Sequence, residues 1–178
     1  MHRRIPNSAR SAGLLLSSPQ QAGGYPGAVF YEHSRPLTKE GVTKTEQTVE
    51  GLKTIGVEPT HILCSPLART QQTAEIAKHI LKFSGNIEIT PELVYDQSPM
   101  LLFPILQTMP PEAVVMCVGH EPHLGQTAAL MLFGNHTPSL SFKKAGSALI
   151  AFHKHATLGQ GILEWWIPSA QLRALRRR

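Results

Sequence analysis

The stretch Ile62-Leu63-Cys64-Ser65-Pro66-Leu67-Ala68-Arg69-Thr70-Gln71-Gln72-Thr73-Ala74-Glu75-Ile76 predicts a buried strand that turns directly into a helix. Its first three residues are apolar, as a strand covered on both faces requires. Ser65 suits an N-cap and Pro66 suits the first helical position. Residues with small or apolar side chains then recur at helical spacing, namely Leu67, Ala74, Ala77 and Leu81.

Arg69 is the unexpected residue of this stretch, because it falls in the first turn of the predicted helix. A cation near a helix N-terminus gains nothing from the helix dipole. A bound anion would explain it, since exposed N–H groups and a guanidinium both favour phosphate. The alternative interpretation is a solvated surface arginine.

The rest of the chain alternates between strand and helix patterns. Apolar runs predict strands at 13–16, 62–64, 87–89 with a possible extension to Leu93, 113–118, 147–152 and 162–167. The last two are close enough for an antiparallel hairpin through Gly159 and Gly161. Helical patterns cover 39–55, 66–81, 122–133 and 170–177, with a helix broken around Pro104 in 99–108.

Helix ends can be assigned from particular residues. Thr38 is a predicted N-cap, with Leu37 packing on Val42 as a hydrophobic staple. Gly56 followed by Val57 is typical of a helix end with its hydrophobic contact, and Gly134 ends a later helix.

This alternation predicts an α/β fold, a three-layer sandwich in which helices cover both faces of a mainly parallel sheet. In such sheets ligands bind beyond the carboxyl ends of the strands. Arg69 and His120 both follow directly after predicted strands, so we expect them at that edge.

The net charge of +5 arises at the two ends of the chain. Seven of the 17 basic residues lie in 1–10 and 171–178, which contain no acid, so the remainder has ten basic and 12 acidic residues. We therefore divide the chain into an atypical, partly disordered segment 1–34, a domain at 35–170 and a basic tail at 171–178. A solvated tail is expected rather than a nucleic-acid face.

The composition excludes several other classes of protein. No apolar run is long enough to span a membrane or to serve as a signal-peptide core, so we expect a cytoplasmic protein. Cys64 and Cys117 lie in apolar runs and predict buried thiols of a reducing compartment. Without CxxC spacing they do not predict a metal site. His153 and His155 alternate along a predicted strand and are interpreted as surface residues.

Four motifs in the chain resemble the histidine phosphatase superfamily, and within it the small SixA-type phosphohistidine phosphatase branch. They occur in the family's order between residues 35 and about 167. The motifs are Arg35-Pro36-Leu37-Thr38-Lys39-Glu40-Gly41, Ser65-Pro66-Leu67-Ala68-Arg69-Thr70-Gln71-Gln72-Thr73-Ala74, Val118-Gly119-His120-Glu121-Pro122-His123-Leu124-Gly125 and Phe142-Lys143-Lys144-Ala145-Gly146.

The resemblance implies a phosphoglycerate mutase-like fold and a reaction that passes through a phosphohistidine. Arg69 would bind phosphate and His120 would hydrogen-bond the phosphoryl group, with no metal or other cofactor. The short segment 85–112 leaves little room for a lid, so the substrate would be a phosphohistidine on a partner protein or a small phosphate ester. We expect a monomer that binds neither nucleic acid nor membrane.

The chain departs from the family at the first strand, where the family has Arg-His-Gly and with it the nucleophile. Ser17-Ser18-Pro19 stand near that place, and no Arg-His-Gly occurs anywhere in the sequence. His2 and His33 are poor alternatives, since neither follows an apolar strand. Asp96 and Glu92 are candidates for the general acid, although either fits a surface carboxylate.

Two hypotheses follow. The chain is a phosphohistidine phosphatase with an altered N-terminus, or it is a catalytically impaired family member that binds phosphate or a phosphorylated partner through Arg69 and His120.

Overall fold

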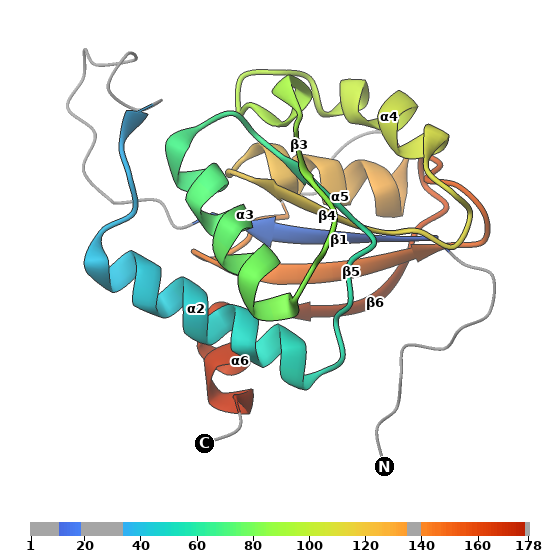
Figure 1. Cartoon of the computed structure of the whole chain (residues 1–178). Coiled ribbons are helices and arrows are strands. Elements are labelled where there is room, and N and C mark those ends of the chain that lie inside the picture. The colour runs from blue at the N-terminus through green and yellow to red at the C-terminus, as the bar shows by residue number, and fades with distance from the viewer. Residues whose placement is uncertain (1–10, 19–33, 135–139, 177–178) are drawn as a thin grey trace.

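The computed structural model describes residues 11–18, 34–134 and 140–176. Within them the elements follow one another as an alternation of strands and helices (Figure 1). Their order is β1 (Ser11–Ser17), α2 (Lys39–Thr54), β2 (His61–Cys64), α3 (Ala68–Leu81), β3 (Ile87–Ile89), the 3-10 helices η1 (Pro91–Leu93) and η2 (Pro99–Leu101), α4 (Leu102–Thr108), β4 (Val114–Gly119), α5 (His123–Phe133), β5 (Ser147–Phe152), β6 (Ile162–Ile167) and α6 (Ser169–Leu175).

The described strands form one sheet in the order β3-β2-β4-β1-β5-β6. β1 pairs parallel with β4, which pairs parallel with β2, and β2 pairs parallel with β3. β5 runs antiparallel to β1 and forms the predicted hairpin with β6. The expectation of a mainly parallel sheet is confirmed, with β5 as the reversed strand among those described.

Two hydrophobic cores lie on opposite faces of this sheet. Along β4, Met116 and Val118 face the core shared with α2, α3 and α6, whereas Val115 and Cys117 face the core shared with α4 and α5. The period-two alternation of a strand divides these side chains between the faces. The three-layer arrangement is therefore confirmed, and it explains why the central strand is apolar throughout.

The ends of α2 are formed as predicted. The Gly41 N–H donates to Thr38 Oγ1 at 3.0 Å, which makes Thr38 the N-cap. At the other end Gly56 has φ 83°, and the Val57 N–H donates to the Leu52 carbonyl at 3.1 Å. Val57 is buried. This is the left-handed helix end with a hydrophobic contact that the sequence predicts.

The start of α3 differs from the prediction. The helix begins at Ala68, after Leu67, which makes no side-chain capping bond, so Ser65 is not the N-cap. The Ser65 N–H instead donates to the Val118 carbonyl at 3.0 Å and continues the pairing of β2 with β4. Thr70 Oγ1 donates to the Ser65 carbonyl at 2.7 Å and closes the turn into the helix.

The segment between β3 and β4 also differs in detail. Leu93 belongs to η1 rather than to a strand, and the change of helix type falls between Leu101 and Leu102. Pro104 lies in the first turn of α4, where its missing N–H has no helical partner to lose, so it does not break the helix.

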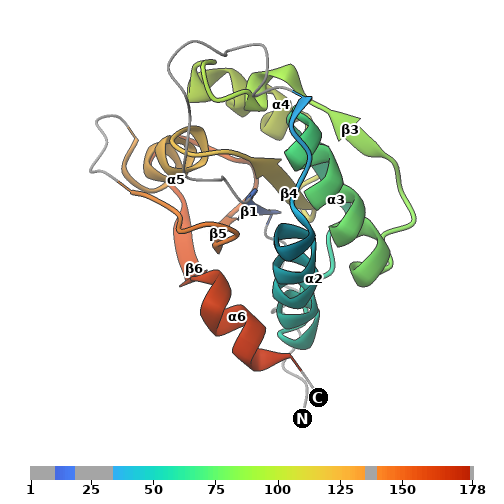
Figure 2. The same ribbon diagram turned by 90° about the vertical axis from the view of Figure 1, so that its left-hand side faces the viewer.

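The domain extends beyond residues 35–170 at both ends. β1 lies inside the sheet between β4 and β5, so residues 11–17 belong to it. α6 packs against α2 (Figure 2), and its Leu172 is fully buried. At Gly51 a Cβ atom would lie 2.1 Å from the Leu172 carbonyl oxygen, so only glycine permits this approach.

The predicted tail from 171 is thus helical to Leu175. Of the partly disordered segment predicted at 1–34, residues 1–10 and 19–33 lie outside the described residues, whereas Ser11 and Ala12 belong to β1 and are ordered.

Candidate active site

The carboxyl ends of β1, β2 and β4 meet at one edge of the sheet. Ser17 is in register with Gly119, and Cys64 with Val118. The Ser18 N–H donates to the Gly119 carbonyl at 2.8 Å, one residue past the end of β1. Residues that follow these strands are therefore held at the same edge, where an α/β sheet binds its ligands.

Arg69 lies in the first turn of α3, directly after β2, and is only 4% exposed. The interpretation as a solvated surface arginine is therefore wrong. A buried guanidinium stays charged and must be matched by acceptors, because an uncompensated charge is costly to bury. Its carbonyl accepts a hydrogen bond from Thr73 Oγ1 at 2.8 Å, which ties Arg69 to the next turn of the helix.

His120 follows β4 without a break and is 1% exposed. Its carbonyl accepts from the Leu124 N–H at 3.0 Å as α5 begins. The two predicted site residues thus follow neighbouring strands at one edge. Burial at 1% is also what a core histidine would show, so exposure alone does not assign its role.

Ser17 and Ser18 occupy the end of β1 and are 2% and 1% exposed. Thr73 Oγ1 lies 3.4 Å from Ser18 Oγ, within hydrogen-bond distance. Since Thr73 is four residues after Arg69, both side chains lie on the same face of α3. The hydroxyl groups of Ser17 and Ser18 therefore lie at the end of β1, beside the helix that carries Arg69. Pro19, the third residue of this predicted position, lies outside the described residues.

The segment before α2 also reaches this part of the molecule. The Leu37 N–H donates to Gln72 Oε1 at 2.6 Å, and Gln72 lies in the same stretch of α3 as Arg69. This bond brings the first motif, beginning at the half-buried Arg35, alongside the second. The sequence motif contains Arg35 but does not predict its position in the fold.

Glu121 is a structural residue of the site that its sequence position alone did not reveal. Its Oε1 accepts from the Gly125 N–H at 3.1 Å, at the start of α5. Burial raises the pKa of Glu121, and hydrogen bonds from the Phe142 and Gly125 N–H groups and the Ser141 hydroxyl oppose that shift. The carboxylate therefore joins the start of α5 to the segment that leads into β5.

Among the candidate general acids, Asp96 is exposed, and its Oδ1 accepts from the Gln97 side chain at 3.5 Å. Glu92 is half-buried in η1, and its backbone lies against the ring of His123. The structure thus places the Glu92 backbone beside His123, three residues after His120.

The two cysteines are buried and free, as predicted. Burial raises the pKa of each thiol to about 12, so neither is a reactive thiolate near neutral pH.

His153 and His155 are exposed, as expected, but lie just past the end of β5. Over residues 11–18, 34–134 and 140–176, no three His, Cys, Asp or Glu side chains gather as metal ligands, and no helix could cross a bilayer.

His123, in the first turn of α5, predicts a specific pH dependence of stability. Burial lowers its pKa to about 4, and a hydrogen bond to the Glu92 backbone opposes this shift. An unfolded histidine titrates near 6.5, so between these values the unfolded chain binds a proton that the folded chain excludes. The free energy of unfolding should therefore fall by about 2–3 kcal/mol between pH 7 and 4.5 through this residue.

Urea denaturation of the His123→Gln variant checks this expectation. The variant should lose less stability than the parent chain over the same pH range, whereas His79→Gln, at an exposed histidine of α3, should behave like the parent. Equal pH dependence in the parent and in His123→Gln would refute the assignment.

Known proteins resemble this chain in sequence and in fold. Residues 30–94 match the family model described as the histidine phosphatase superfamily (branch 1). The chain is 33% identical over 118 residues to an uncharacterized protein of Picosynechococcus sp. (strain PCC 7002), covering 63% of this chain and 68% of that protein. It is 27% identical over 141 residues to the phosphohistidine phosphatase SixA of Escherichia coli K12, covering 78% of this chain and 84% of SixA.

A solved structure shows the same fold. The protein histidine phosphatase SixA complexed with tungstate superposes with a TM-score of 0.76 and 24% identity, covering 90% of this chain and 99% of that one. The chain therefore has relatives similar in sequence over most of its length, and it shares its fold with a solved phosphatase structure. The chain belongs to the histidine phosphatase superfamily.

Proposed function

We propose that this chain binds the phosphate group of a phosphohistidine on a partner protein, or of a small phosphate ester, at the carboxyl edge of the sheet. In this proposal Arg69 and His120 bind the phosphoryl oxygens, and the chain hydrolyses the ligand slowly because serines rather than a nucleophilic histidine stand at the end of β1. The observation that carries the proposal is the pair of buried hydroxyls, Ser17 and Ser18, at that position.

The role of Arg69 follows from its chemistry and its place. A guanidinium presents paired N–H donors that match two oxygens of a phosphate, and it remains charged at every physiological pH. It lies at the start of a helix, where backbone N–H groups also favour an anion. His120 would add a ring N–H donor from the neighbouring strand end.

Ser18 does not replace a nucleophilic histidine. A serine hydroxyl needs an adjacent base to become nucleophilic, whereas a neutral imidazole already carries a free lone pair near pH 7. The hydroxyl nearest to Ser18 Oγ is Thr73 Oγ1 at 3.4 Å, and a neutral hydroxyl is too weak a base to take up the serine proton. By the family resemblance, Ser17 also replaces an arginine, so one bidentate phosphate donor is lost.

The second candidate function is phosphohistidine phosphatase activity, and the name of the Escherichia coli relative favours it. It requires a nucleophile other than the residues at the end of β1. His33 precedes Arg35 by two residues and lies outside the described residues, as does His2. Loss of turnover in a His33→Ala or His2→Ala variant would support this candidate.

His120→Ala tests the proposed phosphate site. A hydrogen bond to a charged group contributes about 1.5–3 kcal/mol, so the affinity for vanadate should fall at least about tenfold in titration calorimetry. His79→Ala, which removes an exposed imidazole from the same chain, should bind like the parent. If thermal unfolding drops by several degrees while vanadate affinity is retained, His120 is a core residue and the proposal fails.

A further inference from the structure

The fourth motif forms a sharp turn that the proposed phosphate site does not use. Lys143 and Lys144 are exposed, whereas Ala145 behind them is buried with φ 55°. The Gly146 N–H donates to the Lys143 carbonyl at 2.6 Å and closes the turn. Two adjacent ammonium groups are therefore presented outward from a compact piece of backbone.

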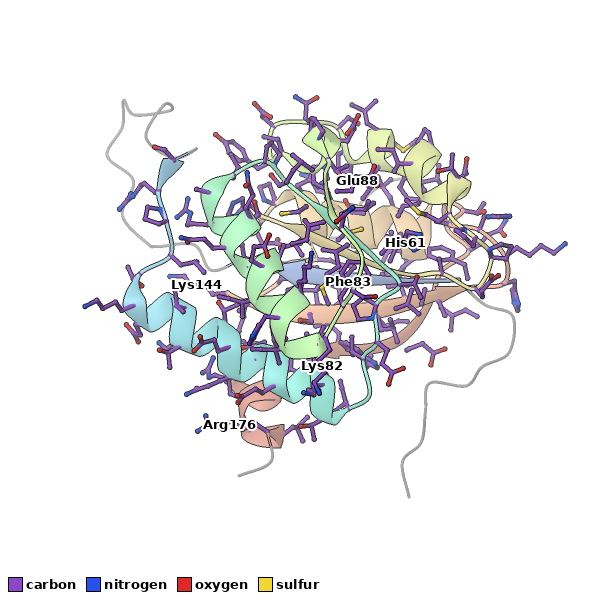
Figure 3. All side chains as sticks on the ribbon, in the orientation of Figure 1. His61, Lys82, Phe83, Glu88, Lys144 and Arg176 are labelled. Carbon is purple, nitrogen blue, oxygen red and sulfur yellow. The ribbon has the colours of Figure 1, made fainter. Side chains whose placement is uncertain are left out.

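This turn is attached to the end of β1. The Gly146 carbonyl accepts from the Ser17 N–H at 3.0 Å. Because β5 runs antiparallel to β1, its first residue lies at the edge where β1 ends, and Ser147 is in register with Leu16. Figure 3 shows Lys144 on the side of the molecule where β1 ends. The lysine pair thus borders the proposed phosphate site.

The turn is held in place on its other side as well. Phe142 is buried and stacks on Trp166 of β6, with ring centroids 3.9 Å apart and an interplanar angle of 11°. The Phe142 N–H and the Ser141 hydroxyl both bond to Glu121. Charges that are fixed before binding cost less conformational entropy to bring to a partner.

The two lysines carry charge that nearby groups do not neutralise. The described part of the chain offers neither of them an ion-pair partner, in contrast to Lys44, which pairs with Glu40 in α2. Glu121, the carboxylate that accepts from the Phe142 N–H at the start of this motif, is half-buried and engaged by backbone and hydroxyl donors. This border of the site is therefore positive.

We propose that Lys143 and Lys144 form a docking element for an acidic segment that flanks the phosphorylated residue of a partner protein. The inference rests on the proposed function, since it assigns the neighbouring contacts of the same ligand. Two lysines suit a short acidic peptide segment, whereas nucleic acids are bound by longer series of phosphate contacts. Charges at the rim of an interface mainly set partner choice and association rate.

The test compares two peptides that carry a non-hydrolysable triazole-phosphonate analogue of phosphohistidine. One has glutamates and the other has glutamines on both sides of the analogue, and binding to the full chain is measured by fluorescence anisotropy. The acidic peptide should bind about three- to tenfold more tightly at low salt, because each exposed charge pair contributes modestly. The preference should nearly vanish at 0.5 M salt, which is about the ionic strength that screens such pairs.

The double variant K143E/K144E should lose this preference or reverse it, while its affinity for inorganic phosphate changes less than about twofold. K53E/K154E, with the same change in net charge at exposed lysines elsewhere, should keep the preference. Equal binding of both peptides to the parent chain would refute the role of the two lysines in docking, without contradicting the proposed phosphate site. If neither peptide nor inorganic phosphate binds, the proposed function itself fails. Tighter binding of a short single-stranded DNA than of the acidic peptide would reassign the lysines to nucleic acid and overturn the inference.

Discussion

Replacing Ser17-Ser18-Pro19 with Arg-His-Gly should raise the rate of phosphomonoester and phosphohistidine hydrolysis by about 10³-fold or more, because it supplies the missing nucleophile and a second phosphate-binding arginine. The register of β1 with β4 places Ser17 at the end of that strand, and by the family resemblance the Arg-His-Gly motif is expected there. A phosphoenzyme that is labile in acid and stable in base should then be trapped with labelled substrate. Steady-state turnover and this labelling are the two measurements.

The matched control is Arg-Ala-Gly in the same three positions, which restores the arginine without the imidazole and should form no phosphoenzyme. Because Ser17 and Ser18 are buried, thermal unfolding of both variants must show that the larger side chains are accommodated. Robust turnover by the unmodified chain, insensitive to change at Ser18, would contradict the assignment of the strand end. If that turnover depended on His33, the nucleophile would lie beside Arg35.

Arg69→Ala should weaken the binding of phosphate or vanadate by about 10- to 150-fold. The guanidinium forms charge-assisted hydrogen bonds, which contribute about 1.5–3 kcal/mol, and this range converts directly to that loss of affinity. Titration calorimetry measures the change. Arg173→Ala is the control, since this arginine donates to Ser169 Oγ within α6 at 3.0 Å and should not affect phosphate.

An unchanged affinity in the Arg69→Ala variant would show that the anion, if bound, lies elsewhere. The Arg69→Lys variant refines the result, because a lysine keeps the charge but loses the paired donors. An affinity between those of the parent and of Arg69→Ala would show that geometry as well as charge contributes.

Much of the fold could be predicted because its signals are local. The hairpin at Ser147–Phe152 and Ile162–Ile167, the Thr38 N-cap and the glycine end of α2 all depend on residues adjacent in sequence. The start of α3 could not be predicted in the same way. Ser65 is a good N-cap by residue type, but tertiary pairing with β4 keeps it in the sheet.

The sequence predicts those residues of the candidate site that come shortly after the end of a strand. Arg69 and His120 could be placed at one edge from the alternation of strand and helix, whereas the burial of Arg69 depends on packing that periodicity does not reveal. The link from Glu121 to Ser141 and Phe142 joins segments 20 residues apart, and no local pattern indicates it. The helix predicted at 170–177 forms as α6 (Ser169–Leu175), but its packing on the domain was missed for the same reason, since Leu172 is buried where α6 meets α2.

In the proposed function a phosphate-like anion binds at the carboxyl edge of the sheet, between Arg69 and His120. A crystal structure of the full chain with tungstate, located by its anomalous scattering, tests this binding site most directly. We expect the oxyanion within hydrogen-bond distance of the Arg69 guanidinium and the His120 ring, beside Ser18. Tungstate bound elsewhere, or absent from this edge at a concentration that saturates the chain in solution, would contradict the account.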